Sequence, residues 1–242
     1  MGTLVDFHSH ILPGIDDGSS SSAESLAMLR MEAQQGIGHV IATPHFYAHY
    51  DTPERFLARR EASMNRLLRA AEGTVDLPKI DLGAEVYYFP GISDSEVLPR
   101  LTIAEKKCIL IEMPPSPWTE TMYRELEGIY VKQDLLPVIA HVDRYITPLR
   151  NYGIPQRLAE LPVLVQANAD FFLRRTTASF ALRLLREDRI HVLGSDCHNL
   201  AGRAPNLGNA VRVIHKHLGD ETVERIRERE KEILSRWLQD EE

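Results

Sequence analysis

Histidine and carboxylate side chains recur along the chain, most of them directly after a short apolar run. His8 and His10 follow the first run two residues apart, so on an extended chain both side chains point to the same side. The full set of candidate metal ligands is His8, His10, Asp17, His45, Glu85, Glu112, His141, Asp196 and His198. Imidazole and carboxylate groups without an obligatory thiolate suit Mn²⁺, Zn²⁺ or Fe²⁺ better than Ca²⁺. Nine donors exceed one tetrahedral site and predict two or three divalent ions, with a bridging carboxylate such as Glu85.

The residues alone leave two questions about this set of ligands open. Asp16 and Asp17 are adjacent, so one of them binds metal while the other caps the turn. The sixth apolar run ends near Gln166 and Asn168 and is the only one without a His, Asp or Glu at its end. The remaining histidines that begin strands or lie in helices are expected to be ordinary surface or hydrogen-bonded residues: His39, His191, His215 and His217.

The apolar runs are the elements that must position these side chains. They are short and rich in Val, Ile or Leu, which is typical of strands buried on both faces. The seven runs are Leu4–Phe7, His39–Ala42, Ile80–Gly83, Cys108–Glu112, Pro137–Ala140, Val163–Gln166 and His191–Gly194. Uncompensated, five histidines and four carboxylates at one place would be costly through desolvation and like-charge repulsion, and divalent cations remove that cost.

Helical patterns lie between the runs. A capping box of Ser21 and Glu24 opens one helix, and Thr52 and Pro53 open a second with Leu57, Met64, Leu68 and Ala71 on one face. Further helices are predicted near 118–134, 155–161, 178–188, 206–218 and 220–239, whereas 93–107 contains a proline and is expected to be irregular. In the last helix, the stripe Val223, Ile226, Ile233 and Trp237 is apolar. Its charged residues, Glu230 among them, predict a solvated face or a contact with another subunit.

Seven strands alternating with helices predict a parallel sheet, either closed as a barrel or open and doubly wound. Ligand-type residues at the ends of six strands favour the barrel, because a barrel brings all its strand ends to one rim. The 242 residues suit a single domain, 1–242. A net charge of −7 argues against nucleic acid, and no apolar run is long enough to insert into a membrane. Two cysteines fit a reducing cytoplasm.

Six motifs together resemble a known superfamily. They are Asp6–His10, Leu12–Gly18, Thr43–His45, Gly83–Tyr87, Ile139–Tyr145 and Ser195–Asn199. The chain is similar over residues 4 to about 208 to the PHP (polymerase and histidinol phosphatase) superfamily, and in particular to the bacterial tyrosine-protein phosphatases of the CpsB/YwqE type, encoded with capsule and exopolysaccharide genes. The segment Phe46–Tyr50 departs from that pattern, which often has a second His directly after the Thr-Pro-His motif.

The resemblance implies a distorted (β/α)₇ barrel, a cluster of Mn²⁺-type ions, and hydrolysis of phosphotyrosine on a membrane-associated bacterial tyrosine kinase that controls polysaccharide synthesis. It assigns metal binding to the nine residues above, favours Asp17 over Asp16, and places Arg144 and Arg203 at the phosphate. A hydroxide activated by metal would attack phosphorus in line, and Asp196 or a nearby His would steer protons. The alternatives are a small-molecule phosphatase, for example on histidinol phosphate, and a catalytically silent metal-binding regulatory subunit.

A different chemistry is suggested by Cys197 and Arg203, which match the C-x₅-R spacing of cysteine-dependent tyrosine phosphatases. Such a thiolate must sit among backbone N–H groups at a helix N-terminus, with a lowered pKa. Cys197 instead lies between Asp196 and His198, and side-chain alternation points it away from both. A two-residue match at fixed spacing is weak, so the metal-dependent route is preferred.

Overall fold

The computed structural model describes residues 4–147 and 153–235. Its strands are all parallel to their neighbours. They are β1 (Leu4–Ser9), β2 (Ile37–Ala42), β3 (His45–Phe46), β4 (Lys79–Leu82), β5 (Glu85–Tyr87), β6 (Cys108–Glu112), β7 (Leu136–Ile139), β8 (Leu164–Asn168) and β9 (Val192–Gly194). Each of the seven predicted strands is present.

Two of the seven strands are interrupted halfway, which splits the sheet into the orders β1-β2-β4 and β3-β5-β6-β7-β8-β9. Thr43 and Pro44 separate β2 from β3, and Gly83 and Ala84 separate β4 from β5. The two parts remain joined by hydrogen bonds, because Gly83 N–H donates to the Ala42 carbonyl (2.8 Å) and Glu85 N–H to the Pro44 carbonyl (3.0 Å). The nine segments therefore run as seven strands in chain order.

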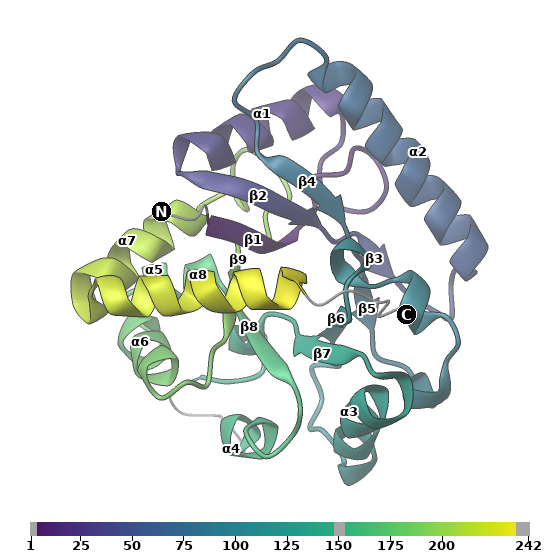
Figure 1. Cartoon of the computed structure of the whole chain (residues 1–242), viewed down its shortest axis with the longest axis vertical. Coiled ribbons are helices and arrows are strands. Elements are labelled where there is room, and N and C mark those ends of the chain that lie inside the picture. The colour runs from purple at the N-terminus through teal and green to yellow at the C-terminus, as the bar shows by residue number, and fades with distance from the viewer. Residues whose placement is uncertain (1–3, 148–152, 236–242) are drawn as a thin grey trace.

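The sheet curls until its first and last strands meet. Asp196 N–H donates to the His8 carbonyl (2.8 Å), and His10 N–H donates to the Cys197 carbonyl (2.9 Å). Helices lie around the outside of the curled sheet, as Figure 1 shows. This arrangement confirms the predicted (β/α)₇ architecture of the barrel type, in which the carboxyl ends of the strands share one rim.

The helices agree with most of the predicted ranges. They are α1 (Ser22–Gln34), α2 (Pro53–Ala71), α3 (Glu120–Gln133), α4 (Ile154–Leu158), α5 (Ala169–Leu173), α6 (Ala178–Arg186), α7 (Leu207–Leu218) and α8 (Asp220–Ser235). The segment expected to be irregular holds three single turns, η1 (Ile92–Asp94), η2 (Leu98–Arg100) and η3 (Ile103–Glu105), and η4 (Val142–Arg144) follows β7. The short α5 was not predicted. No helix of the described ranges is long and apolar enough to cross a membrane.

Local signals set the helix starts. The Ser21 hydroxyl accepts a hydrogen bond from Glu24 N–H, whereas the Glu24 carboxylate accepts from Ser20 N–H and not from Ser21 as a full capping box requires. The predicted face of α2 is partly correct: Leu57 and Met64 pack against the core, but the buried residues Phe56, Ser63 and Leu67 lie one position earlier, and Leu68 is 48% exposed. The apolar face of α2 is wide, so two neighbouring rows of residues along the helix are both apolar in sequence.

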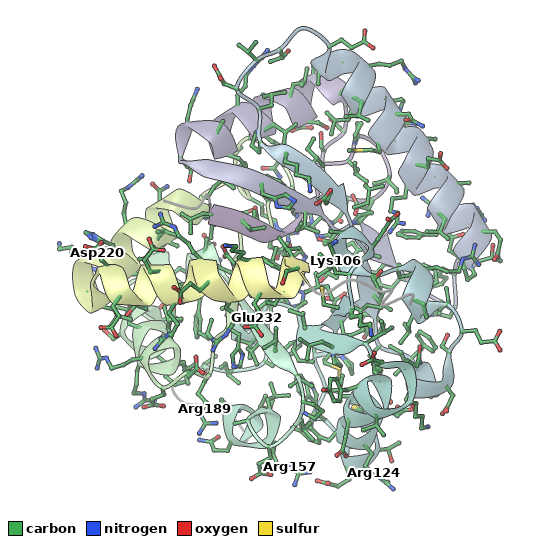
Figure 2. All side chains as sticks on the ribbon, in the orientation of Figure 1. Lys106, Arg124, Arg157, Arg189, Asp220 and Glu232 are labelled. Carbon is green, nitrogen blue, oxygen red and sulfur yellow. The ribbon has the colours of Figure 1, made fainter. Side chains whose placement is uncertain are left out.

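The last helix closes the other end of the barrel. In Figure 1, α8 runs across the front of the molecule next to β1 and β9, which it contacts, and in Figure 2 its labelled Asp220 and Glu232 lie toward opposite ends of the helix. Val223, Ile226 and Ile233 are buried as predicted, and Trp237 lies outside the described residues. The prediction for Glu230 is wrong, since this carboxyl is buried and accepts a hydrogen bond from Val5 N–H (3.1 Å). Burial raises its pKa, so the group is held neutral.

Candidate metal centre

The rim at the carboxyl ends of the strands gathers all nine predicted ligands. His8 and His10 come from β1 and the residues after it, His45 opens β3, and Glu85 opens β5. Glu112 ends β6, His141 follows β7, and Asp196 and His198 follow β9. Asp17 comes from the loop between β1 and α1. Six of the nine are buried: His8, His10, Glu85, His141, Asp196 and His198.

Glu85 lies at the middle of the cluster. Its Oε2 is 3.2 Å from His8 Nε2, 3.2 Å from His10 Nε2 and 2.9 Å from His45 Nδ1. Its Oε1 is 2.6 Å from His141 Nε2. One buried carboxylate therefore faces four imidazoles, two from β1 and its end, one from β3 and one from the end of β7. That is the geometry expected of a bridging ligand.

The remaining carboxylates surround this centre. Asp17 Oδ1 is 3.4 Å from both His45 Nε2 and His198 Nε2. Glu112 Oε1 is 3.5 Å from His141 Nε2, and Asp196 Oδ1 is 3.6 Å from His8 Nε2. Three groups each offer ligand atoms that all lie within 4.8 Å of one another: His10, Asp17, His45 and His198; His8, His10 and Glu85; and His45, Glu85 and Glu112.

The orientation of these atoms fits bound cations. Glu85 Oε2, His45 Nδ1 and His198 Nε2 are buried and make no hydrogen bond, although other ligand atoms lie close to each of them. Buried polar atoms are nearly always hydrogen-bonded, and an unmatched one indicates an ion or another missing partner. Several lone pairs aimed at common points, and not at donors, are what a multinuclear divalent site requires.

Asp16 contacts two of the candidate ligands from behind the cluster. Its Oδ2 is 2.8 Å from His10 Nδ1 and accepts from His45 N–H (3.1 Å), while its Oδ1 accepts from Gly18 N–H (3.0 Å). A carboxylate bonded to the second nitrogen of a histidine fixes the ring orientation and leaves the first nitrogen for metal. Asp16 therefore holds the turn, while Asp17 faces His45 and His198.

The sixth strand contributes amides where the others contribute ligands. Gln166 Oε1 lies 3.3 Å from His8 Nδ1 and accepts from His141 N–H (2.5 Å). Asn168 Nδ2 donates to Asp196 Oδ2 (2.9 Å). The break in the sequence pattern at β8 therefore marks residues that orient three of the candidate ligands. A polar pair at the buried end of an apolar strand was the signal that could have revealed them.

Two candidate ligands have unusual backbone conformations. His141 has φ 33° and Asp196 has φ 53°, both in the left-handed region that residues with a Cβ rarely adopt. Such strain is concentrated at functional sites and needs support from the surrounding structure. Gly194, two residues before Asp196, allows β9 to pack closely against β1, because a Cβ at this position would lie 2.6 Å from His8 Cβ.

The electrostatics of the centre reflect many buried charges. Burial lowers the pKa of His10, but the hydrogen bonds that it donates to Asp16 and Glu85 outweigh burial and raise it to about 10. Burial and the charge of His10 lower the pKa of His198 to about 4. Burial and the neighbouring Glu85 raise the pKa of Glu112. The proton that these contacts favour on His10 is one that a divalent ion would have to displace.

Arg144 and Arg203 meet at one carboxylate. Arg144 donates to Asp196 Oδ2 (2.5 Å) and to Glu112 Oε1 (3.3 Å), and Arg203 donates to Asp196 Oδ1 (2.7 Å). Burial acts to raise the pKa of Asp196, but the charges of His8, His10 and Arg144 lower it further than burial raises it. Asp196 is thus ionised, and two half-exposed guanidinium groups flank the mouth of the centre.

Cys197 points away from this centre. Its thiol is fully buried and groups with Asp6 and Glu32. Burial, together with the charges of those two residues, raises its pKa well above the ordinary value, so it is held as a thiol. The C-x₅-R spacing with Arg203 therefore does not form a thiolate site.

Comparison with known proteins agrees with the geometry. The family model for capsular polysaccharide synthesis, CpsB/CapC, matches residues 4–235. The chain belongs to the CpsB/CapC family. Among its relatives, the tyrosine-protein phosphatase YwqE of Bacillus subtilis is 31% identical over 229 residues, covering 90% of this chain and 86% of that protein. The tyrosine-protein phosphatase CpsB of Streptococcus pneumoniae is 28% identical over 233 residues, covering 89% and 91%.

Solved structures resemble this CpsB/CapC member over nearly its whole length. A structure from work on YwqE and CpsB, described as metal-dependent tyrosine phosphatases, superposes with a TM-score of 0.81 at 25% identity, covering 97% of this chain and 95% of that one. The phosphotriesterase homology protein of Escherichia coli has a TM-score of 0.56 at 12% identity, which shows a shared fold. All nine candidate ligands and both arginines lie within the part that the CpsB/CapC model matches.

Proposed function

We propose that this chain is a metal-dependent protein-tyrosine phosphatase. The observation that carries the proposal is the buried Glu85 carboxylate facing four imidazoles, with Arg144 and Arg203 at the mouth of the same cluster. The relatives named tyrosine-protein phosphatases, aligned over about nine-tenths of the chain, support the choice of reaction.

The proposed ligands are the nine residues of the rim: His8, His10, Asp17, His45, Glu85, Glu112, His141, Asp196 and His198. They would hold two or three divalent ions, with Glu85 as the bridge. Mn²⁺ is the proposed metal on the resemblance to the CpsB/YwqE-type phosphatases, and the imidazole and carboxylate donors would also suit Zn²⁺ or Fe²⁺. When bound, the ions supply positive charge against the phosphoryl oxygens and lower the pKa of water at the site.

The protein side chains have separate tasks in this proposal. Arg144 and Arg203 bind the phosphoryl oxygens through charge-assisted hydrogen bonds. Asp196 holds the two guanidinium groups in place through both of its carboxylate oxygens. Its lowered pKa keeps it ionised, so it acts as a ligand and an anchor for the arginines, not as the proton donor to the leaving group.

The proposed substrate is a phosphotyrosine on a bacterial tyrosine kinase that regulates polysaccharide synthesis. The support is the family, which is defined by capsular polysaccharide synthesis, and the names of the relatives. The proposed compartment is the cytoplasm, since the chain has only two cysteines and both Cys108 and Cys197 are buried, which suits a reducing environment.

The test compares two phosphomonoesters with metal-stripped protein. We expect no hydrolysis after chelation, and recovery with Mn²⁺ on a phosphotyrosine peptide that exceeds recovery on histidinol phosphate in kcat/KM. A preference for histidinol phosphate would assign the site to small molecules. Stoichiometric metal binding without turnover on either substrate would indicate the catalytically silent regulatory subunit.

A further inference from the structure

A pocket of about 310 Å³ lies next to the metal centre on the same rim. It is formed by the loop between β6 and α3, by the start of α3 and α4, and by the residues after η4. Its main walls are Pro115, Pro117, Trp118, Tyr123, Arg144 and Tyr145. None of the nine candidate metal ligands lines it, so the proposed hydrolysis leaves it without a task.

The walls of this pocket are held in place. The Trp118 ring packs edge-on against Tyr145, with ring centres 5.1 Å apart, and its indole N–H donates to the Pro114 carbonyl (3.2 Å). The Tyr145 hydroxyl accepts from Met113 N–H (2.9 Å). Aromatic rings fixed by hydrogen bonds and edge contacts form a surface that needs little ordering when a ligand binds.

Helices α3 and α4 support the outer side of the pocket. The Arg157 guanidinium from α4 lies 4.9 Å from the centre of the Tyr123 ring of α3 and donates to Glu120 (2.6 Å). In Figure 2, Arg157 and Arg124, from α4 and α3, lie at the same edge of the molecule. The ring of Tyr123 is therefore fixed between the two helices.

Arg144 connects the pocket to the metal centre. Its guanidinium donates to Glu112 and Asp196 in the cluster, and the same residue lines the pocket. A group bound in the pocket would thus lie beside a phosphoryl group held by Arg144. Because two carboxylates already balance the charge of Arg144, the pocket offers little attraction to an acidic side chain. Its apolar rings and the face of a guanidinium suit a neutral aromatic ring.

We propose that this pocket, defined by Trp118, Tyr123 and Tyr145, binds an aromatic side chain that flanks the phosphotyrosine in the protein substrate. The inference rests on the proposed function and adds to it a choice among phosphotyrosine sites. The side chain bound in the pocket belongs to a neighbouring residue and is not the phosphotyrosine ring, since Arg144 lies between the pocket and the metal cluster.

The experiment uses the Mn²⁺-loaded protein and phosphotyrosine peptides that differ only by Phe or Ala at one flanking position, scanned in turn. At one position we expect kcat/KM to favour Phe by about tenfold, as burial of an aromatic side chain allows. Trp118→Ala should reduce that preference to about twofold or less. The activity on p-nitrophenyl phosphate, which has no flanking residue, should stay unchanged.

Two further variants keep the test decisive. Ser116→Trp adds a ring at an exposed lining position and should also abolish the preference without removing a buried contact. Tyr130→Ala removes a partly exposed ring from α3 outside the pocket and should leave the preference intact.

Different failures have different meanings. Absence of a Phe preference at every position, with efficient peptide hydrolysis, would overturn this inference and leave the phosphatase activity standing. An equal loss on p-nitrophenyl phosphate and on both peptides in Trp118→Ala would also overturn it, because the pocket would then serve the phosphotyrosine ring or the position of Arg144. Absence of hydrolysis of all these substrates would remove the proposed function and this inference together.

Discussion

The substitution Asp16→Asn tests whether the carboxylate behind His10 prepares the site for metal. Asp16 Oδ2 lies 2.8 Å from His10 Nδ1 and accepts a hydrogen bond from His45 N–H (3.1 Å), while Oδ1 accepts one from Gly18 N–H (3.0 Å). An asparagine has one acceptor oxygen, so if it keeps the bond to Gly18, an amide N–H₂ faces His10 and His45. Two candidate ligands then lose the group that orients them.

The expected loss can be derived from these contacts. A hydrogen bond to a charged partner contributes about 1.5–3 kcal/mol, and removal of such outer partners lowers metal affinity by about 10–100-fold. The loss should grow with pH. Asp16 helps to raise the pKa of His10 to about 10, so near pH 7 metal must displace a proton from His10. In the variant His10 is less basic, so protons compete less with metal for it. This gain offsets part of the lost metal affinity at pH 7 but a smaller part at pH 9, where fewer protons compete in either protein.

The assay is Mn²⁺ titration by calorimetry at pH 7 and pH 9, with activity measured at saturating metal. Asp81→Asn is the matched control, because Asp81 Oδ2 also lies 2.8 Å from a histidine nitrogen, His39 Nε2, on strands of the same sheet but outside the cluster. It should leave metal affinity unchanged. Unchanged affinity of Asp16→Asn at both pH values, in protein that folds normally, would refute the role given to Asp16.

Three other changes test separate parts of the molecule. Cys197→Ser should keep most phosphatase activity, since the thiol is buried and protonated; its complete loss with metal still bound would restore the thiolate route. Arg203→Ala should lower kcat/KM on a phosphotyrosine peptide by about 10²–10³-fold at unchanged metal content, and Arg203→Lys should have a kcat/KM between those of the wild type and Arg203→Ala. If Arg203→Ala had the kinetics of the wild type, Arg203 would not belong to the phosphate site. Burial and Arg229 lower the pKa of His191 to about 4 from 6.5, and its neutral Nδ1 accepts from Val165 N–H. Stability from His191 is therefore complete above pH 6.5 and lost as pH falls toward 4, by about 2–3 kcal/mol. In urea titrations, His191→Gln should flatten this dependence, whereas His215→Gln, at an exposed position, should not.

The strands could be predicted because a strand that is buried on both faces is made almost entirely of apolar residues. A run such as Cys108–Glu112 is apolar up to its last residue, and that residue, Glu112, marks the rim. The interruptions at Thr43 and Gly83 could not be predicted, because they depend on hydrogen bonds to neighbouring strands. Glu230 was misjudged for a similar reason. Its surroundings along α8 are charged, and only the docking of that helix on Val5 removes it from water.

Candidate ligands were predictable from residue type and position, whereas the residues that orient them were not. His141 and Asp196 were expected at strand ends, and in the structure they follow β7 and β9 by two residues. Gln166 and Asn168 could be noticed only as a break in the pattern, since an amide side chain carries no chemistry of its own that marks it as part of a metal site. Asp16 could not be separated from Asp17 by spacing, because the distinction is one of direction: one carboxylate faces His10 Nδ1 and the other faces His45 and His198.

The closure of the sheet and the assembly of the site depend on the same contacts. Asp196 N–H donates to the His8 carbonyl, and His10 N–H to the Cys197 carbonyl, so the backbone pairing of the first and last strands fixes three candidate ligands at once. The Ser195 hydroxyl and N–H both donate to the buried Asp6 carboxylate directly behind these strands. The positive φ of Asp196 is therefore imposed by pairing on one side and by Asp6 on the other. Because the cluster joins residues nearly 190 positions apart, it exists only when the barrel is closed, and cations that bind it must also stabilise that closure.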